Sequence, residues 1–219
     1  MGANAGLAAS RRSAPPARRA VISPLLANIY LDPLDVLMAE RGYRMVRYAD
    51  DFVILCRSRE EADEALALVG SWVTENGLTL HPEKTHVGDC TVVGEGFEFL
   101  GYRFEAGRRF VRKKSLNKLE DSIRAKTGRC RGVSLATAIA DLNPMLRGWF
   151  NFFKQAHHTT FADLDGFIRR RLRSMLLKHK KRSHIGFGTL IHKTWPNAFF
   201  ANAGLFALHT AWQSARRSR

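Results

Sequence analysis

The sequence predicts an α+β domain, an antiparallel sheet with backing helices, followed by an all-α domain. Over residues 21–105, short strand-like apolar runs alternate with helical patterns, whereas after Arg112 only helical patterns recur. The charge changes sign at the same place. Residues 1–105 carry 11 Lys and Arg against 15 Asp and Glu, and residues 106–219 carry 24 against 5. We therefore expect a domain boundary near residues 105–114.

Residues 1–20 are small and basic and contain Pro15-Pro16, so we expect a disordered leader. The first acidic residue is Asp32, and an acid-free, Arg-rich start is also typical of an organellar transit peptide. The three cysteines are far apart and form no CxxC pair, which indicates a reducing compartment. These features favour a cytoplasmic, bacterial protein, with a mitochondrial or plastid location as the alternative.

Local signals define the elements of the α+β part. The predicted elements are a helix from Ser23-Pro24 to Gly42, strands at 45–48 and 52–56, a helix from a capping box at 58–61 to Gly77, and strands at 78–80 and 97–102. Proline at the first helical position and a Ser with Glu three residues later are typical helix starts. The first two strands flank Ala49-Asp50-Asp51, so they predict a hairpin.

Four helices are predicted after residue 112. They start at Ser115, Ser134, Pro144 and Thr160, and Asn143-Pro144 is expected to break one helix and begin the next. The aromatic residues Trp149, Phe150, Phe152 and Phe153 fall at helical spacing. We interpret most of them as core residues, with base stacking as the alternative.

The net charge of +15 and the pI near 10.5 favour a polyanionic partner, most simply nucleic acid. The scattered histidines and cysteines form no zinc-binding pattern and no His-Asn-His nuclease pattern. No apolar run approaches the roughly 18 residues of a membrane span, so we expect no membrane partner.

Two adjacent carboxylates, Asp50 and Asp51, stand at the tip of the predicted hairpin. They repel each other unless a cation lies beside them, and a pair of Mg²⁺ ions could supply it for nucleotidyl transfer. Because adjacent strand residues point to opposite faces, we expect Asp50 to be the main ligand and Asp51 a secondary one. The alternative is a solvated turn.

Eight segments carry a family resemblance. They lie at residues 21–31, 48–51, 77–85, 99–102, 142–150, 164–172, 195–200 and 204–206. In order and spacing they resemble group II intron reverse transcriptase/maturases. The first resembles the palm helix and Tyr48-Ala49-Asp50-Asp51 the catalytic box. Residues 142–150 and 164–172 resemble the maturase domain, domain X, and the last two segments the family's C-terminal tail. The resemblance implies a partial reverse transcriptase palm over 21–105 and a thumb and maturase domain over 106–219.

The resemblance also implies the site and the partners. Asp50 and Asp51 correspond to catalytic, metal-binding residues, and Tyr48, Ala49 and Lys84 to residues near the nucleotide and the primer-template. The implied partners are group II intron RNA and a DNA primer or target, and the implied cofactor is Mg²⁺ in a two-metal site. For Lys84, an ordinary surface lysine is the alternative.

Two departures from the family concern the start of the chain. The family carries upstream fingers and a strand with another metal-binding Asp, and residues 1–20 supply neither. Arg18-Arg19-Ala20 stand where the family has Gln-Gly-Gly. The two-metal site is therefore expected to be incomplete and the chain alone inactive as a polymerase. A missing N-terminal half of the enzyme is a candidate partner, and a homodimer is left open.

The basic residues of the helical part, together with the neutral Asn151, are candidate RNA-binding residues. The basic members are Arg112, Lys113, Lys114, Arg147, Lys154, Arg169, Arg170, Arg173, Lys178, Lys180, Lys181 and Arg182. On the predicted fourth helix, Arg169, Arg170 and Arg173 are expected on the outer face. The residues expected to point inward are Leu164, Phe167, Ile168, Leu172 and Met175. The alternative is an ordinary solvated face.

Three functions stay open at this stage. The chain is an RNA-directed DNA polymerase fragment, an RNA-binding maturase that assists splicing, or an inactive truncated remnant.

Overall fold

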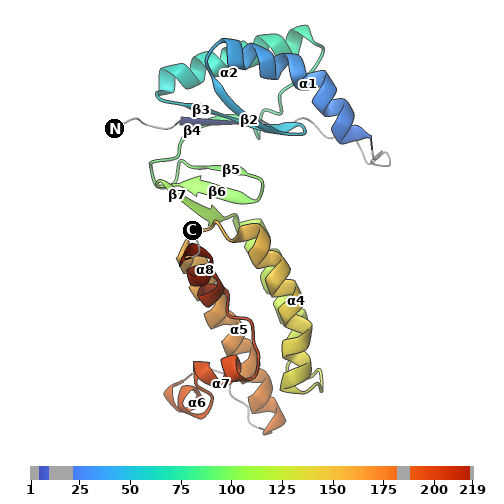
Figure 1. Ribbon diagram of the computed structural model, residues 1–219, viewed down its shortest axis with the longest axis vertical. Helices are drawn as coiled ribbons and strands as arrows, with labels where there is room; N and C mark the ends of the chain where they lie inside the picture. The colour runs from blue at the N-terminus through green and yellow to red at the C-terminus, as the bar shows by residue number, and fades with distance from the viewer. Residues whose placement is uncertain (1–4, 10–21, 182–187, 218–219) are drawn as a thin grey trace. The chain divides into compact units, whose positions relative to one another are not determined.

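The computed structural model describes residues 5–9, 22–181 and 188–217 (Figure 1). The chain divides into two compact units, Met1–Arg109 and Phe110–Arg219, called here the α+β unit and the helical unit. The first combines small antiparallel sheets with helices and the second is mostly helical, which confirms the predicted fold class.

The larger sheet of the α+β unit has the strand order β2-β3-β1-β4. Its strands are β1 (Ala5–Ala9), β2 (Arg44–Tyr48), β3 (Asp51–Cys56) and β4 (His86–Asp89). The hairpin of β2 and β3 confirms the prediction for that segment. β1 is antiparallel to β3 and β4, with Ala9 opposite Phe52. It differs from the disordered leader expected over residues 1–20, and residues 1–4 and 10–20 lie outside the described part of the chain.

Two helices, α1 (Ser23–Glu40) and α2 (Arg59–Glu75), cover one face of this sheet (Figure 1). Leu34 and Met38 of α1 are fully buried against the side chains that β3 and α2 turn toward them. The Ser58 hydroxyl accepts a hydrogen bond from the Glu61 amide at 3.2 Å, so the predicted cap of α2 is confirmed. For α1 the predicted cap is wrong by one residue, because Ile22 occupies the N-cap position.

A second sheet has the strand order β5-β6-β7. Its strands are β5 (Phe97–Phe99), β6 (Tyr102–Glu105) and β7 (Arg108–Val111). Leu100-Gly101 and Ala106-Gly107 form its two turns, and all four residues have positive φ, which matches the right-handed twist of short hairpins. The single strand predicted over 97–102 is therefore wrong. So is the strand at 78–80, where only Leu80 forms a bridge.

The helical unit contains six helices in its described residues. They are α3 (Lys113–Lys126), α4 (Leu135–Phe153), α5 (His158–His179), α6 (Thr189–Thr194), α7 (Asn197–Asn202) and α8 (Leu208–Arg217). The predicted cap at Ser134 is confirmed, because its hydroxyl accepts from the Thr137 amide at 3.1 Å. The starts predicted at Ser115 and Thr160 are wrong, since α3 and α5 each begin two residues earlier.

Pro144 lies inside α4 and does not break it, contrary to prediction. An internal proline costs a helix about 3 kcal/mol, so packing must compensate. Leu142 and Leu146 are fully buried on either side of it. The side chain of Asn143 does not cap a helix. It donates to the Gly204 carbonyl at 2.8 Å and accepts from the Phe206 amide at 2.8 Å, and so fixes the C-terminal segment to α4.

An aromatic core joins α4 to α5. Phe150 and Phe161 meet edge to face with ring centroids 5.5 Å apart, and Phe150 and Phe153 are each 6% exposed. Phe152 is 61% exposed and is not part of this core. Asp165 of α5 accepts hydrogen bonds from the amides of Leu208 and His209, at 3.0 and 3.1 Å, and thereby caps α8. Burial raises the pKa of Asp165 despite these bonds.

Candidate functional site: an aspartate hairpin and a cationic helical surface

The two candidate catalytic carboxylates lie at the tip of the β2–β3 hairpin. Tyr48 pairs with Asp51 across the hairpin, so Ala49 and Asp50 form its two-residue turn. Asp50 is exposed, Asp51 is half-buried, and Tyr48 is 66% exposed. Because Asp50 belongs to the turn and not to a strand, strand alternation does not set the direction of its side chain.

Arg47 connects this hairpin tip to α1 through hydrogen bonds. Its guanidinium makes a bidentate ion pair with Asp35 and donates to Asn28 Oδ1 at 2.9 Å. It also donates to the carbonyl oxygen of Ala49, in the turn itself, at 2.9 Å. The hydrogen bond to Asp35 raises the pKa of Arg47. Ala49 has φ +55°, a left-handed conformation that costs a non-glycine residue about 1–2 kcal/mol and needs such support.

Arg47 was not among the residues predicted for the site. A signal was present in the sequence, because an arginine directly before the box interrupts an otherwise apolar strand. Its position beside Met45, on the face that packs against the helices, indicates a buried partner for its charge.

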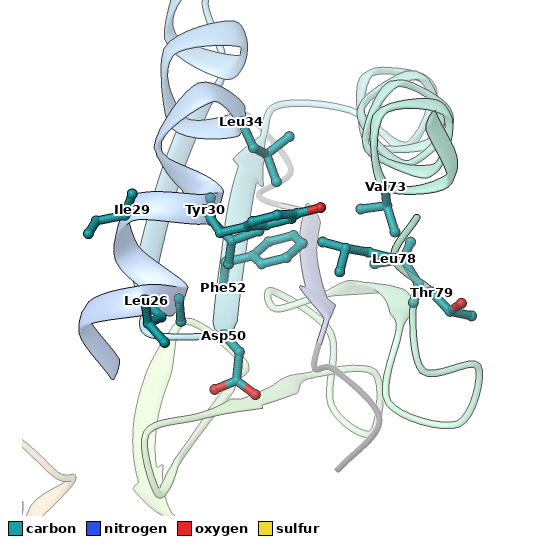
Figure 2. Close-up of a pocket in the computed structure, with 12 residues that line it drawn as sticks. Leu26, Ile29, Tyr30, Leu34, Asp50, Phe52, Val73, Leu78 and Thr79 are labelled. Carbon is teal, nitrogen blue, oxygen red and sulfur yellow. The ribbon is translucent and has the colours of Figure 1, made fainter. Parts of the chain in front are cut away.

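A mostly apolar cavity of about 480 Å³ lies beside Asp50 (Figure 2). The aromatic rings of Tyr30 and Phe52 lie at its centre, whereas the carboxylate of Asp50 points away from them at its edge. The Tyr30 hydroxyl donates to the Asn76 carbonyl at 2.7 Å. This cavity offers apolar contacts close to the hairpin tip, and among the described residues that line it Asp50 is the charged one.

The described residues do not by themselves form a ligand set for two Mg²⁺ ions. Such ions need several oxygen ligands in a near-octahedral arrangement. Within residues 5–9, 22–181 and 188–217, no three His, Cys, Asp or Glu side chains gather in a group that could hold a metal. Besides its hairpin partner β2, strand β3 pairs with β1, whose residues Ala5–Ala9 include no acid. Asp50 and Asp51 alone would therefore leave such a pair of ions without a further carboxylate.

Lys84, the other predicted nucleotide-binding residue, is exposed in a turn closed by a hydrogen bond from the Thr85 amide to the His81 carbonyl at 2.9 Å. In the described part of the chain, no hydrogen bond or ion pair joins Lys84 to Asp50 or Asp51. The structure thus brings Tyr48, Ala49 and the aspartates together, and Lys84 stands apart from their contacts.

Cations and a polar residue at the start of α3 and along α4 are accessible. Lys113 and Lys114 are exposed, while the preceding Arg112 is half-buried and donates to the Ser115 hydroxyl at 3.2 Å. Arg147, Asn151 and Lys154 are exposed at positions i, i+4 and i+7 of α4, so they share one face. The Arg147 guanidinium lies 4.5 Å from the ring centroid of Phe206.

The arginines of α5 do not all lie on its outer face. Arg170 is exposed, and Arg169 is half-buried with its Nη1 4.0 Å from Asp165 Oδ2. Arg173 is only 2% exposed, so its prediction as an outer-face residue is wrong. It donates to the Trp195 carbonyl and to Asn197 Oδ1, both at 3.0 Å, because α7 packs over this side of α5.

The end of α5 carries Lys178, Lys180 and Lys181, all exposed. The Lys180 ammonium lies 5.1 Å from the ring centroid of Trp195. Arg182, the last predicted RNA-binding residue, lies outside the described residues.

Most of the few acids of the helical unit are already engaged. Glu120 and Asp121 pair with Arg124, Asp141 pairs with Arg131, and Asp165 is buried. Among the described residues, Lys113, Lys114, Arg170, Lys178, Lys180 and Lys181 have no ion pair. The surface of the helical unit is therefore strongly cationic.

Comparisons with known proteins agree with this arrangement. Residues 20–104 match the family described as reverse transcriptase (RNA-dependent DNA polymerase). The α+β unit is thus a reverse transcriptase domain. Residues 116–195 match the group II intron, maturase-specific domain. The chain belongs to the group II intron reverse transcriptase/maturase family, which confirms the resemblance seen in the sequence.

No curated protein matches the chain. Among solved structures, it is similar to the telomerase of Candida albicans, solved in complex with the TWJ fragment of telomeric RNA. The identity is 14% and the TM-score is 0.33, over 69% of this chain and 27% of that one. The chain therefore spans 27% of the length of that protein. No helix within the described residues is both long and apolar enough to cross a bilayer.

Proposed function

We propose that this chain acts as a maturase, whose helical unit binds group II intron RNA and assists its splicing. The observation that carries the proposal is the imbalance of charge on the surface of that unit. Its exposed lysines at the start of α3 and at the end of α5 have no carboxylate partner among the described residues, whereas most of its acids are paired or buried. A surface of unpaired cations attracts phosphates and releases counterions when RNA binds.

Charge reversal tests this proposal. The triple variant Lys178→Glu/Lys180→Glu/Lys181→Glu should lower the affinity for a group II intron transcript about 100-fold near 0.1 M salt, and it should reduce the salt slope by about 2–3. The matched control is Arg41→Glu/Arg59→Glu, two exposed arginines of the α+β unit, which should leave both values nearly unchanged. Filter binding over a range of salt concentrations measures them. Equal losses in both variants would show a non-specific charge effect and remove the proposal.

We further propose that Asp50 and Asp51 are the carboxylates that the reverse transcriptase domain contributes to metal-dependent nucleotidyl transfer. Their place at a hairpin tip, held by Arg47, supports this role. When bound, Mg²⁺ would activate the attacking hydroxyl and neutralise charge on the phosphates. The described residues lack the further carboxylate such a site requires, so the maturase function is the better supported of the two.

We accordingly expect the purified 219-residue chain to show no templated cDNA synthesis, because two neighbouring carboxylates without a third ligand fix two metals poorly. Primer extension on an RNA template with Mg²⁺ measures this. The Asp50→Ala variant should bind intron RNA as the unaltered chain does. Synthesis by the unaltered chain, lost in Asp50→Ala, would show that the site is complete after all.

A further inference from the structure

A second cavity of about 840 Å³ lies within the α+β unit, and among the described residues Glu61 of α2 is the helix residue in its wall. One wall is the face of β2 and β3 that α1 and α2 leave uncovered, where Val46 and Leu55 are 50% and 38% exposed. The other wall is the sheet β5-β6-β7, which touches the first sheet where Phe97 packs against Val53. A volume of this size lies in the range of about 300–1,000 Å³ typical of small-molecule sites.

Four arginines surround this cavity without a carboxylate partner. Arg44, Arg57, Arg108 and Arg109 are all exposed, and the structure gives none of them an ion pair in the residues it describes. This concentration of charge contrasts with the rest of the unit, in which acids outnumber bases. Unpaired guanidinium groups around a hollow are donors suited to phosphate oxygens.

The two acids in the cavity wall do not neutralise these arginines. Glu105 pairs with Arg103 at 3.0 Å and accepts from the Gly94 amide, and the hydrogen bond from Arg103 lowers the pKa of Glu105. Glu61 accepts a hydrogen bond from the Arg57 amide and keeps its charge, but one carboxylate cannot balance four arginines. The cavity therefore keeps a positive rim.

The floor between the arginines is apolar and aromatic. Phe97 and Phe104 stack with ring centroids 5.0 Å apart, and Phe99 and Phe104 are only partly buried. Apolar surface left open to water is unfavourable, and a planar ring bound there would cover it. A ligand that fits both the arginine rim and the aromatic floor has a phosphate group and an aromatic ring.

The cavity lies at the opposite end of the β2–β3 hairpin from the aspartates. Arg44 pairs with Leu55, four residues along the strand from the pair of Tyr48 and Asp51. At about 3.4 Å per residue, the two ends are separated by roughly 14 Å. A ligand at Arg44 therefore does not occupy the metal-binding position at Asp50.

We propose that this cavity is a second nucleotide-binding site, in which the base lies on the partly exposed rings of Phe99 and Phe104 and the phosphates contact Arg44 and Arg108. The site binds without a divalent ion, because arginines and not carboxylates hold the phosphates. Its ligand is either a free nucleotide or the terminal nucleotide of a single strand, which share the same chemistry. The inference is independent of RNA binding by the helical unit.

Calorimetric titration of the full chain with ATP in EDTA tests the proposal. Saturable binding is expected, with adenosine alone and pyrophosphate alone each at least about tenfold weaker, since each retains only one of the two contacts. The variant Arg44→Glu/Arg108→Glu should weaken ATP binding at least about tenfold. Leu55→Glu, which places a carboxylate on the wall formed by β2 and β3, should also weaken ATP binding at least about tenfold. Circular dichroism verifies that both variants are folded.

Two controls separate this site from other surfaces. ATP affinity should be unchanged in the helical-unit variant Lys178→Glu/Lys180→Glu/Lys181→Glu and in Asp50→Asn. Absence of saturable binding in EDTA would overturn the proposal. So would a loss in the helical-unit variant equal to that in Arg44→Glu/Arg108→Glu, or a loss in Asp50→Asn.

Competition distinguishes the two sources of the nucleotide. A single-stranded RNA 12-mer with a 5′-triphosphate should displace ATP more strongly than its 5′-hydroxyl counterpart if a strand end is the ligand. Equal and weak displacement by both identifies the free nucleotide. Either result supports the site, whereas displacement by a fatty acid but not by nucleotides would overturn it in favour of an amphiphile.

Discussion

Replacing Arg173 by alanine should lower the free energy of unfolding of the helical unit by about 3–5 kcal/mol, whereas replacing Arg170 should change it by less than about 0.5 kcal/mol. Arg173 is 2% exposed and donates to the Trp195 carbonyl and to Asn197 Oδ1. Its guanidinium also lies 5.2 Å from the ring centroid of the fully buried Phe200. The alanine variant would leave a void between α5 and α7 and a buried carbonyl without a donor.

The variant Arg173→Met separates packing from charge. Burial lowers the pKa of Arg173, with a smaller contribution from Arg169, which shows that its charge is held at a cost. Methionine keeps much of the volume and removes that charge, so it should cost about half as much as alanine. Urea unfolding followed by tryptophan fluorescence measures these changes, because three of the four tryptophans lie in the helical unit.

RNA binding provides the complementary result. Arg173→Met should bind intron RNA as the unaltered chain does, whereas Arg170→Glu should bind it more weakly. If both substitutions left stability intact and both weakened binding, Arg173 would be a surface contact and its burial against α7 would be refuted.

The sequence could place the α5 helix but not its second buried face. The predicted apolar stripe defines one side of the helix. Its members Leu164, Ile168, Leu172 and Met175 are buried, whereas Phe167 is half-buried beneath Arg124 and Arg170. Arg173 and Asp165 are buried on other sides, because α7 and α8 also pack against α5. Those contacts join residues more than 20 positions apart, and no local periodicity encodes them.

The aspartate hairpin was predictable because its signals are local. Two apolar strands, a two-residue turn and the Tyr48–Asp51 box lie within a short stretch of chain. β1 was not predictable, because it lacks such local signals. Its residues Ala5–Ala9 are Ala and Gly apart from Leu7, have weak strand propensity and show no alternation, and only pairing with β3 and β4 makes them a strand. Pro144 likewise marks a helix end by propensity, and burial on both sides of it overrides that preference.

The candidate sites also include features that the sequence predicts and features that only tertiary contacts create. The carboxylates of Asp50 and Asp51 and the exposed lysines could be read from residue type and spacing. The cavity bounded by Arg44 and Arg108 could not, because it forms only when the hairpins β2–β3 and β5–β6 meet face to face.

Removal of Arg47 should have the second large effect. Arg47→Ala should destabilise the α+β unit by about 2–4 kcal/mol, since hydrogen bonds to charged groups contribute more than neutral ones and three acceptors lose their donor. Its side chain is 11% exposed, and it connects Asp35 and Asn28 of α1 to the Ala49 carbonyl in the turn. Arg47→Lys should lose most of the same free energy, because an ammonium cannot reproduce the bidentate geometry.

Two comparisons test the origin of that effect. Arg44→Ala, on the opposite face of the same strand and without an ion pair in the described residues, should change the stability by less than about 0.5 kcal/mol. A double-mutant cycle with Asp35→Ala should give a coupling of about 1–3 kcal/mol, somewhat reduced because the Asp35 side chain is 35% exposed. Chemical denaturation measures both.

The geometry of the turn gives a readout that stability alone does not. Ala49 is held at φ +55° while its carbonyl accepts from Arg47, so removing that donor should release the turn. The amide resonances of Ala49, Asp50 and Asp51 should then shift or broaden under conditions in which Arg47→Ala is still folded, whereas in Arg44→Ala they should keep their positions. Unchanged resonances in Arg47→Ala would mean that the hairpin holds the two carboxylates in place without help from α1.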